Sequence, residues 1–374
     1  MELKRPFPFL SKLALVLFCL IAIFYIIYIG QDILVPIAFA VLLALLLLPL
    51  NNFLEKRIGR VSAILISLAL AILIISIVIY FLSVQISGFI DDFPTLKKQV
   101  NTHIRTLQKW VFEQFHITRT EQTKYINEAT AEFTDNKSSF IGATFLTITE
   151  SLIFLVLLPI YTFLMLYYRD MIRKFLVSVF AAKHRNDVEE VISESRHIVH
   201  GYMVGLMIEM AIVAAINISG FLIVGIKYAF FLGMLAAILN LIPYIGMLIA
   251  NIFCMLVTIS TSNNLTDVLL VFVVLSVVQF IDNNIIMPKV VSSKVKINAL
   301  ITILGVLVGG AICGLAGMFL SIPIIAIFKS IFDRVEELKP WGELLGDEIT
   351  YTHKGRLMRR MVEARKRKQM KNVK

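Results

Sequence analysis

Two acidic residues lie inside long apolar stretches of the sequence, where an ionised side chain is costly. Glu209 belongs to the stretch 202–224, and Asp282 belongs to the stretch 268–287. A third acid, Glu150, is closer to the outer boundary of its own apolar stretch. Ionisable groups in such positions mark substrate or ion pathways by default. A buried carboxyl group that takes up a proton or holds a sodium ion would couple transport to an ion gradient.

The sequence around Glu209 indicates contact with protein rather than with lipid. Gly201, Gly205, Glu209, Val213 and Asn217 follow one another at intervals of four residues, so they share one side of a helix. Small residues on such a stripe allow neighbouring helices to approach closely. We therefore expect this side of the helix to face another helix.

Asp282 lies in the densest polar cluster of any apolar stretch. Gln279, Asp282 and Asn283 share one side of a helix, and Asn284 follows them. A structural alternative stays open, in which Asp282 caps the end of its helix or pairs with Lys289. The predicted substrate or ion path comprises Glu209, Asn217, Asn240, Tyr244, Gln279, Asp282, Asn283 and Asn284, with Asn251 beside it.

The composition indicates an integral membrane protein. Of the 374 residues, 58% are hydrophobic and 17% are charged, against about 45–50% and about 25% in soluble domains. Most of the net charge of +10 comes from residues 354–374, which hold ten Lys or Arg and one acid. Basic residues gather on the cytoplasmic side of membrane proteins. A nucleic-acid partner is not expected, because no aromatic stacking platform or recognised module accompanies the basic run.

The sequence lacks the patterns of an enzyme. It contains neither the phosphate-binding Gly-x-x-x-x-Gly-Lys nor the metalloprotease pattern His-Glu-x-x-His. Its three cysteines are too far apart for a metal-ligand set. Glu194, His197 and His200 recur every three residues, so they drift around a helix and converge poorly on a metal ion. We expect a non-enzymatic protein without metal or cofactor, apart from a coupling proton or sodium ion.

The apolar stretches predict six full spans and two helical hairpins. A straight span needs about 20 apolar residues, and the six candidates are 13–29, 33–50, 61–87, 144–168, 202–224 and 268–287. The stretches 229–260 and 297–331 are too long for one straight span and too short for two. Each has Pro or Gly near its middle, which weakens a helix there. We therefore predict that both are re-entrant hairpins.

The distribution of basic residues favours the hairpins. With a cytoplasmic N-terminus and two hairpins, fifteen Lys and Arg lie in short inner segments, and only Lys227 lies in a short outer one. If 229–260 crossed once, Lys289, Lys294 and Lys296 would move outside, against the positive-inside rule. The predicted hairpin and hinge residues are Pro243, Gly246, Pro288, Gly309, Gly310, Gly314, Gly317 and Pro323.

These elements predict an all-α polytopic membrane protein whose second half repeats a helix and a hairpin in inverted orientation. Many secondary transporters have such a layout, with the binding site between the repeats. The expected divisions are an N-terminal scaffold of three spans at 1–87, an extracytoplasmic helical insert at 88–142, the fourth span with cytoplasmic amphipathic helices at 143–200, a transport core at 201–335 and a basic cytoplasmic tail at 336–374.

Two polar segments flank the fourth span. In 88–142 an apolar helical stripe is followed by a capping box from Thr118 to Glu121, which predicts a pair of helices. This pair would be a structural cap, or a lid or assembly surface. In 170–200 an apolar stripe with basic neighbours is typical of a helix in the inner headgroup plane. We expect Asn186 or Asp187 to cap the helix that follows.

Several motifs resemble those of the autoinducer-2 exporter family of bacterial membrane transporters. They are Leu239-Asn240-Leu-Ile-Pro243-Tyr244-Ile-Gly246, Asp282-Asn283-Asn284-Ile-Ile-Met-Pro288-Lys289, Gly309-Gly310, Gly314-Leu-Ala-Gly317-Met318 and Ser321-Ile-Pro323. The resemblance covers the chain from about residue 10 to residue 335. The sequence departs from the family pattern at Met247, where Pro is frequent, and at Ser292-Ser293 and Ala299, where Gly and Pro are frequent.

The resemblance implies a multi-pass protein of the bacterial cytoplasmic membrane with both termini in the cytoplasm. It implies export of small polar signalling molecules in quorum sensing, or of metabolites, with elevator-like movement and a homo-oligomer such as a pentamer. Because some relatives resemble sodium or proton antiporters, a monovalent cation/proton antiporter is an alternative. A membrane scaffold without transport is a second alternative, although a scaffold gains nothing from buried acids and weakened spans.

Overall fold

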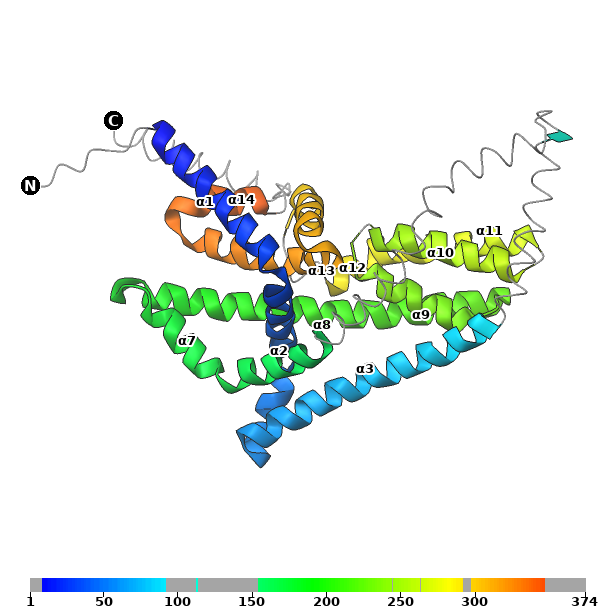
Figure 1. The fold of residues 1–374 in the computed structure, drawn as a ribbon, viewed down its shortest axis with the longest axis horizontal. Coiled ribbons are helices and arrows are strands. Elements are labelled where there is room, and N and C mark those ends of the chain that lie inside the picture. The colour runs from blue at the N-terminus through cyan, green and yellow to red at the C-terminus, as the bar shows by residue number, and fades with distance from the viewer. Residues whose placement is uncertain are drawn as a thin grey trace, which may run out of the picture.

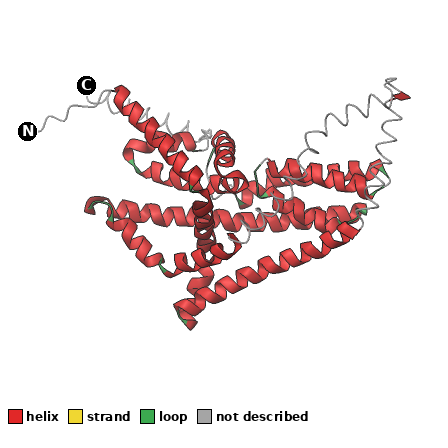
Figure 2. Ribbon diagram, viewed as in Figure 1, coloured by secondary structure: helices red, strands yellow, loops and turns green. Residues whose placement is uncertain are grey.

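The computed structural model is helical throughout the residues that it describes, which are 9–91, 112–113, 154–243, 245–262, 264–291 and 297–346. Within these ranges, β-pairing is limited to a single bridge between Ile297 and Gly346, and Figure 2 shows helices joined by short loops. The prediction of an all-α protein is therefore confirmed. The predicted insert at 88–142, with its capping box, lies almost wholly outside the described residues, as do Glu150 and Tyr244.

Figure 1 shows the arrangement of the helices. Their bounds are α1 Phe9–Ile29, α2 Gln31–Ile58, α3 Arg60–Asp91, α7 Arg169–Ser178, α8 Arg185–Val224, α9 Ala229–Asn240, α10 Ile245–Thr261, α11 Leu265–Ile281, α12 Met287–Val290, α13 Ala299–Arg334 and α14 Lys339–Leu345. Short helical turns lie at Ala182–His184, Asp282–Ile286 and Glu336–Leu338, the second of them a π-helix.

Several helices in the described part of the chain have the length and apolar composition of membrane spans. Five qualify, namely Gln31–Ile58, Arg60–Gln85, Arg185–Val224, Thr266–Val290 and Ala299–Arg334. A sixth is obtained if Phe154–Tyr167 and Arg169–Ser178, which meet at 65°, form one broken span. The predicted first span falls on a shorter apolar helix, Leu13–Ile29. A multi-pass membrane protein with about five or six span-length helices is thus shown.

The segment 229–260 folds back on itself. Helices α9 and α10 pack together, and the Cys254 thiol lies 3.9 Å from the carbonyl oxygen of Leu232. At the turn, a Cβ atom on Gly246 would lie 1.7 Å from the carbonyl oxygen of Leu239. Only glycine allows so close an approach of two backbones. The structure therefore contains the turn that the Pro and Gly pattern predicts.

The segment 297–331 also forms a hairpin, although α13 is continuous in its bounds. Cys313 and Gly314 have non-helical backbone angles, and Gly314 has a φ of +57°. Across the bend, the Ser321 hydroxyl donates a hydrogen bond to the Gly305 carbonyl at 2.8 Å. A straight helix would hold these two residues roughly 24 Å apart at its rise of about 1.5 Å per residue. The chain therefore reverses at Cys313 and Gly314.

The other predicted hinge residues of this segment lie in the arms of the hairpin. A Cβ atom on Gly309 would lie 2.4 Å from the carbonyl oxygen of Gly317, so these two glycines allow the arms to approach closely. Gly310 lies against the Met318 side chain. Pro323 is buried inside the second arm, where the helix continues through it. The glycines thus serve close packing on either side of the bend.

Helix α8 connects the two hairpins. It packs against α9 and α11 at one end and against α2 and α13 at the other, and it runs through the middle of the molecule in Figure 1. Phe221 of α8 shares a buried apolar cluster with Leu232 and Val271. Tyr202 of the same helix shares a second cluster with Leu320. A residue between these two clusters, such as Glu209, is therefore enclosed by protein.

The amphipathic segment contains one difference from the sequence prediction. Helix α7 is amphipathic and buries none of its residues, in agreement with the apolar stripe. The next helix, α8, begins at Arg185 after His184, and no side chain caps its N-terminus. The expected cap at Asn186 or Asp187 is therefore wrong, because a 3₁₀ turn at Ala182–His184 leads the chain directly into the helix.

Candidate ion and substrate site

The structure brings Glu209 and Asp282 together in the protein interior. Glu209 comes from α8 and is 6% exposed, and Asp282 begins the π-helix after α11 and is 2% exposed. Their carboxyl groups are hydrogen-bonded to each other. Two carboxylates offer acceptors only, so one group of this pair must carry the proton that it donates. We call Glu209 and Asp282 the carboxyl pair.

The π-helix that positions Asp282 has a local cause. The Met287 N–H donates to the carbonyl of Asp282, five residues earlier, instead of to the carbonyl four residues earlier. Pro288 follows directly and has no N–H to donate to the carbonyl of Asn284. In a regular α-helix its ring would also clash with that carbonyl. The wider turn results from this interruption. Such π-turns inside helices occur frequently at functional sites.

Asn240, the last residue of α9, joins the carboxyl pair to the first hairpin. Its side-chain Nδ2 donates a hydrogen bond of 2.9 Å to Oδ2 of Asp282. Asp282 is thus bonded to Asn240 and to Glu209. Among the described residues, Oε2 of Glu209 and Oδ1 of Asp282 have no hydrogen-bond partner. The pair therefore has acceptor oxygens to spare.

A small cavity lies beside Asn240. Its volume is about 10 Å³, and its polar walls are Asn217 of α8, Asn240 of α9, Asn251 of α10 and Gln279 of α11. This is about the smallest space that can hold one water molecule. We call these four side chains the amide cavity. Four helices that the sequence separates thus contribute one amide each to a single space.

The predicted path is therefore only partly assembled. Glu209 and Asp282 form the carboxyl pair, and Asn217, Asn240 and Gln279 line the cavity, with Asn240 also bonded to Asp282. Asn283 and Asn284 are exposed at the surface of the chain. The first accepts a hydrogen bond from Gln279, and the second donates to the carbonyl of Phe280. Their amides therefore lie outside the cavity.

Gly205 allows the close helix contact that the spacing of small residues near Glu209 predicts. A Cβ atom on Gly205 would lie 2.8 Å from the carbonyl oxygen of Val290 in α12. This contact holds α8 against the segment that follows Asp282. Gly205 thus helps to position the two members of the carboxyl pair on facing elements.

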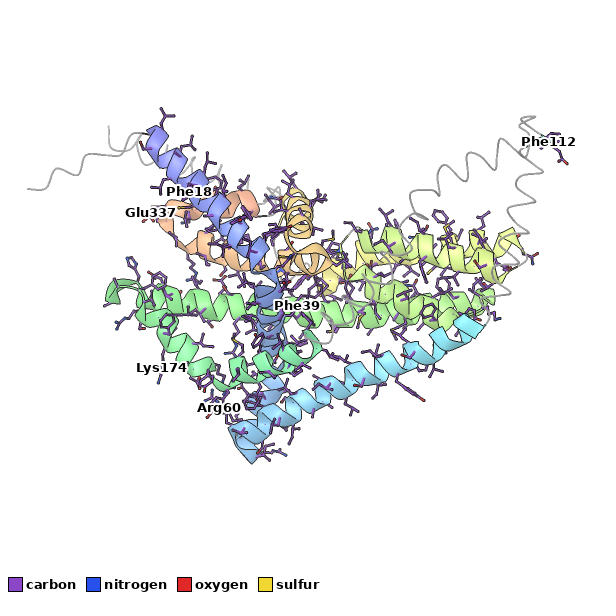
Figure 3. The ribbon with its side chains drawn as sticks, in the orientation of Figure 1. Phe18, Phe39, Arg60, Phe112, Lys174 and Glu337 are labelled. Carbon is purple, nitrogen blue, oxygen red and sulfur yellow. The ribbon has the colours of Figure 1, made fainter. Side chains whose placement is uncertain are left out.

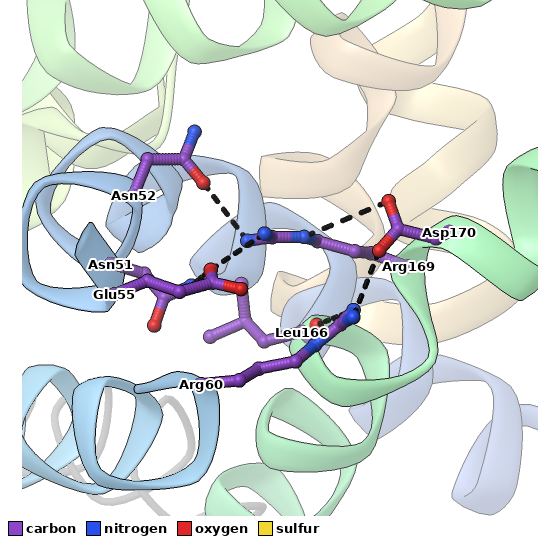
Figure 4. Close-up of polar contacts among 7 residues, drawn as sticks. All are labelled: Asn51, Asn52, Glu55, Arg60, Leu166, Arg169 and Asp170. Carbon is purple, nitrogen blue, oxygen red and sulfur yellow. Dashed lines mark hydrogen bonds and ion pairs between the residues drawn. The ribbon is translucent and has the colours of Figure 1, made fainter. Parts of the chain in front are cut away.

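A second polar cluster, which sequence reasoning missed, lies where α2, α3 and α7 meet (Figure 4). Arg169 donates to Oδ1 of Asn52 at 2.9 Å and to Oε2 of Glu55 at 2.6 Å. Arg60 donates to Oδ2 of Asp170 at 2.9 Å. From the sequence, Arg60 and Arg169 indicated only which side of the membrane is cytoplasmic. We call this group, with Asn51, the ion-pair cluster.

Another set of ion pairs joins α8 to the end of α13. Arg334 donates to Glu190 and, at 3.0 Å, to Oε2 of Glu194. These side chains are exposed. No group of three or more His, Cys, Asp or Glu side chains suited to a metal ion occurs in the described ranges. Glu194 is an ion-pair partner of Arg334.

Comparison with known proteins identifies the fold family of this site. The model of the family described as AI-2E family transporter matches residues 17–337. YueF of Bacillus subtilis is 24% identical over 312 residues, which cover 81% of this chain and 84% of YueF. The AI-2 transport protein TqsA of Escherichia coli is 24% identical over 346 residues, which cover 90% of this chain and 96% of TqsA. Alignments of this extent include both Glu209 and Asp282.

Proposed function

Because the chain belongs to the AI-2E transporter family, we propose that this membrane permease exports small polar signalling molecules or metabolites of the autoinducer-2 type, coupled to a proton or sodium gradient. The E. coli relative TqsA is described as an AI-2 transport protein, which supports this substrate class. The members of the family are transporters and not enzymes, and the chemistry required of the site is therefore binding and release.

The carboxyl pair is the observation that carries the proposal. One carboxyl group belongs to α8, and the other follows α11, with Asn240 of the first hairpin attached to it. When the pair loses its shared proton, two negative charges face each other in an interior of low dielectric constant and repel strongly. The helices must then separate, or a cation must enter. Protonation of this pair thus links an ion to the position of the hairpin.

Further features of the proposal concern the whole protein. We propose that both termini lie in the cytoplasm, that the two helix and hairpin units are inverted repeats, and that copies of the chain assemble into a homo-oligomer such as a pentamer. Helices α1 and α3 support the last point, because they expose apolar side chains such as Phe18 and Ile77. These surfaces suit contact with lipid and with neighbouring subunits.

A monovalent cation/proton antiporter is the second candidate function. The size of the amide cavity favours it, because about 10 Å³ accommodates a bare cation but not a polyhydroxylated signal molecule. In this case the carboxyl pair would exchange its proton for the cation, and the hairpins would carry no organic substrate.

Flux measurements in proteoliposomes test these functions. The intact protein and Asp282→Asn are compared for flux of an autoinducer-2-like polar signal, with and without imposed proton and sodium gradients. Gradient-driven flux that is lost in Asp282→Asn supports the permease. Cation exchange without flux of the signal identifies the antiporter. If neither is found with the intact protein, the remaining alternative is a membrane scaffold without transport.

A further inference from the structure

Neighbouring acceptors engage the side-chain nitrogens of most of the amides in the cavity wall. Asn251 donates its Nδ2 to the carbonyl oxygen of Met247 at 3.0 Å, and Gln279 donates its Nε2 to Oδ1 of Asn283 at 3.0 Å. Asn240 donates its Nδ2 to Asp282 at 2.9 Å. In three of the four amides, a neighbour thus engages the NH₂ group. The carbonyl oxygens remain for an occupant of the cavity.

The chemistry of the neighbours fixes these orientations for two of the amides. The partner of Asn240 is a carboxylate oxygen, and the partner of Asn251 is a backbone carbonyl oxygen. A backbone carbonyl oxygen has no proton to donate. The proton of the carboxyl pair lies between Glu209 and Asp282, so Oδ2 of Asp282 also accepts from Asn240. Each amide must therefore turn its nitrogen toward that partner, because its own oxygen would be repelled there.

Two amides of the cavity wall carry side-chain oxygens that are buried and unpartnered among the described residues. They are Oδ1 of Asn217 and Oδ1 of Asn251, and the Asn217 residue is only 2% exposed. Buried polar atoms in folded proteins almost always have a partner. A cation or a hydrogen-bond donor in the cavity would supply the partner that such oxygens lack.

We propose that the amide cavity binds a dehydrated sodium ion, with the side-chain oxygens of Asn217 and Asn251 as ligands. Amide oxygens are ligands suited to hard cations, and the cavity has about the volume of a single small occupant. A monovalent ion fits better than a divalent one, because protein sites for divalent calcium or magnesium use carboxylates as ligands, whereas all four polar walls of this cavity are neutral.

The position of Asn240 connects this ion to the carboxyl pair. The same amide lines the cavity and donates to Asp282, so the sodium ion lies one side chain away from the carboxylate. The negative charge of a pair that shares one proton attracts the cation without being its direct ligand. The inference rests on the proposed function and deepens it, because it names the coupling ion and its site.

Equilibrium binding of radioactive sodium to the purified full-length protein tests the site. We expect saturable binding by the intact chain that excess sodium or lithium chloride displaces and that choline chloride does not. Asn217→Leu and Asn251→Leu keep a similar side-chain volume but remove the oxygens, and each should weaken binding at least tenfold. Ser260→Ala, which removes a polar group of α10 whose hydroxyl donates to the Leu256 carbonyl, is the matched control and should bind like the intact chain.

Thermal unfolding provides an independent measurement if a variant folds poorly. A ligand that binds only the folded state raises the melting temperature, so sodium should raise that of the intact chain above its value in choline chloride. No saturable sodium binding and equal melting temperatures would show that the cavity holds only water and would overturn the inference. Tighter binding of potassium than of sodium would overturn it as well. Sodium binding without any flux of the polar signal would instead contradict the proposed permease and leave the sodium site standing.

Discussion

The polar centre of this protein and its ion-pair cluster treat charge in opposite ways. In the ion-pair cluster, Arg169 faces Glu55 and Arg60 faces Asp170, so both carboxylates have a guanidinium partner. In the polar centre, which comprises the carboxyl pair and the amide cavity, two carboxyl groups face each other instead. The ion pairs balance their own charges, whereas the carboxyl pair needs a proton or an added cation to offset its negative charge.

Burial sharpens this difference. The side chains of Arg169 and Glu55 are 25% and 24% exposed, so solvent screens part of their charge. Glu209 and Asp282 are 6% and 2% exposed. Four buried oxygens of the polar centre have no partner in the described part of the chain, namely those of Glu209, Asn217, Asn251 and Asp282. A protein that needed the polar centre only for stability would gain from pairing these oxygens. We infer that the ion-pair cluster holds the structure and that the polar centre serves transport.

The largest expected effect separates transport from stability at the polar centre. Glu209→Gln keeps the size of the side chain but cannot gain or lose a proton in the transport cycle. We expect it to abolish the dependence of flux on the proton or sodium gradient. Its melting temperature should change little, because the Gln amide can donate to Asp282 the hydrogen bond that the shared proton supplies in the carboxyl pair.

Parallel assays of gradient-driven flux in proteoliposomes and thermal unfolding in detergent measure these two effects. The Ser260→Ala variant on α10 is the control for both assays. Coupling that survives unchanged in Glu209→Gln would remove Glu209 from the ion path, and a large loss of stability would assign it a structural role instead.

The opposite result is expected in the ion-pair cluster. Arg169→Ala leaves Glu55 without its guanidinium partner and Asn52 without a donor. Because a hydrogen bond to a charged group contributes about 1.5–3 kcal/mol, we expect the free energy of unfolding to fall by roughly 1–3 kcal/mol, less if water reaches Glu55. Denaturant or thermal unfolding measures this loss, and gradient-dependent flux per folded molecule should persist.

Lys174→Ala is the control for the ion-pair cluster, because Lys174 lies on the outer side of the same helix α7 (Figure 3). It should change stability little. If Arg169→Ala folds normally but its flux no longer depends on the gradient, the ion-pair cluster belongs to the transport path. The two regions would then not divide stability and transport between them.

The members of the polar centre could be predicted from the sequence, but their arrangement in space could not. Glu209 and Asp282 stand out because acids are rare in apolar stretches. Their direct contact depends on how α8 packs against the segment after α11, through the approach of Gly205 to Val290. Helical spacing orders residues only within one helix. It carries no information on which helices meet, so the pairing had to come from the structure.

The hairpins show a similar boundary between what the sequence predicts and what packing decides. Pro and Gly near the middle of 229–260 and 297–331 correctly indicate where a helix weakens. Within the second hairpin, however, the bend uses Gly314 with its positive φ, and Gly309 and Gly317 pack against each other. Composition alone cannot distinguish a glycine needed for its backbone angle from one needed for its small size.

A charge-conserving change tests whether geometry or charge holds the ion-pair cluster. Arg169→Lys keeps the positive charge but replaces the planar fork, which reaches Asn52 and Glu55 at once, by a single ammonium group. We expect a loss of about 1 kcal/mol in the free energy of unfolding, between those of the intact chain and Arg169→Ala. A loss as large as that of Arg169→Ala would mean that the fork geometry, and not the charge, carries the stability.

The smallest effect is expected where charges are paired but exposed. Arg334 contacts Glu190 and Glu194, and these side chains are 39%, 62% and 44% exposed. Exposed ion pairs lose most of their attraction in salt, because the screening length falls to about 3 Å at 1 M. Arg334→Gln should therefore melt slightly below the intact chain in low salt and together with it in 1 M salt, as measured by thermal unfolding in detergent. A large difference that persists in high salt would show that the link between α8 and α13 is structural in the same sense as the ion-pair cluster. The exposure of the Arg334 pairs would then not explain why they stabilise the protein less than the ion-pair cluster does.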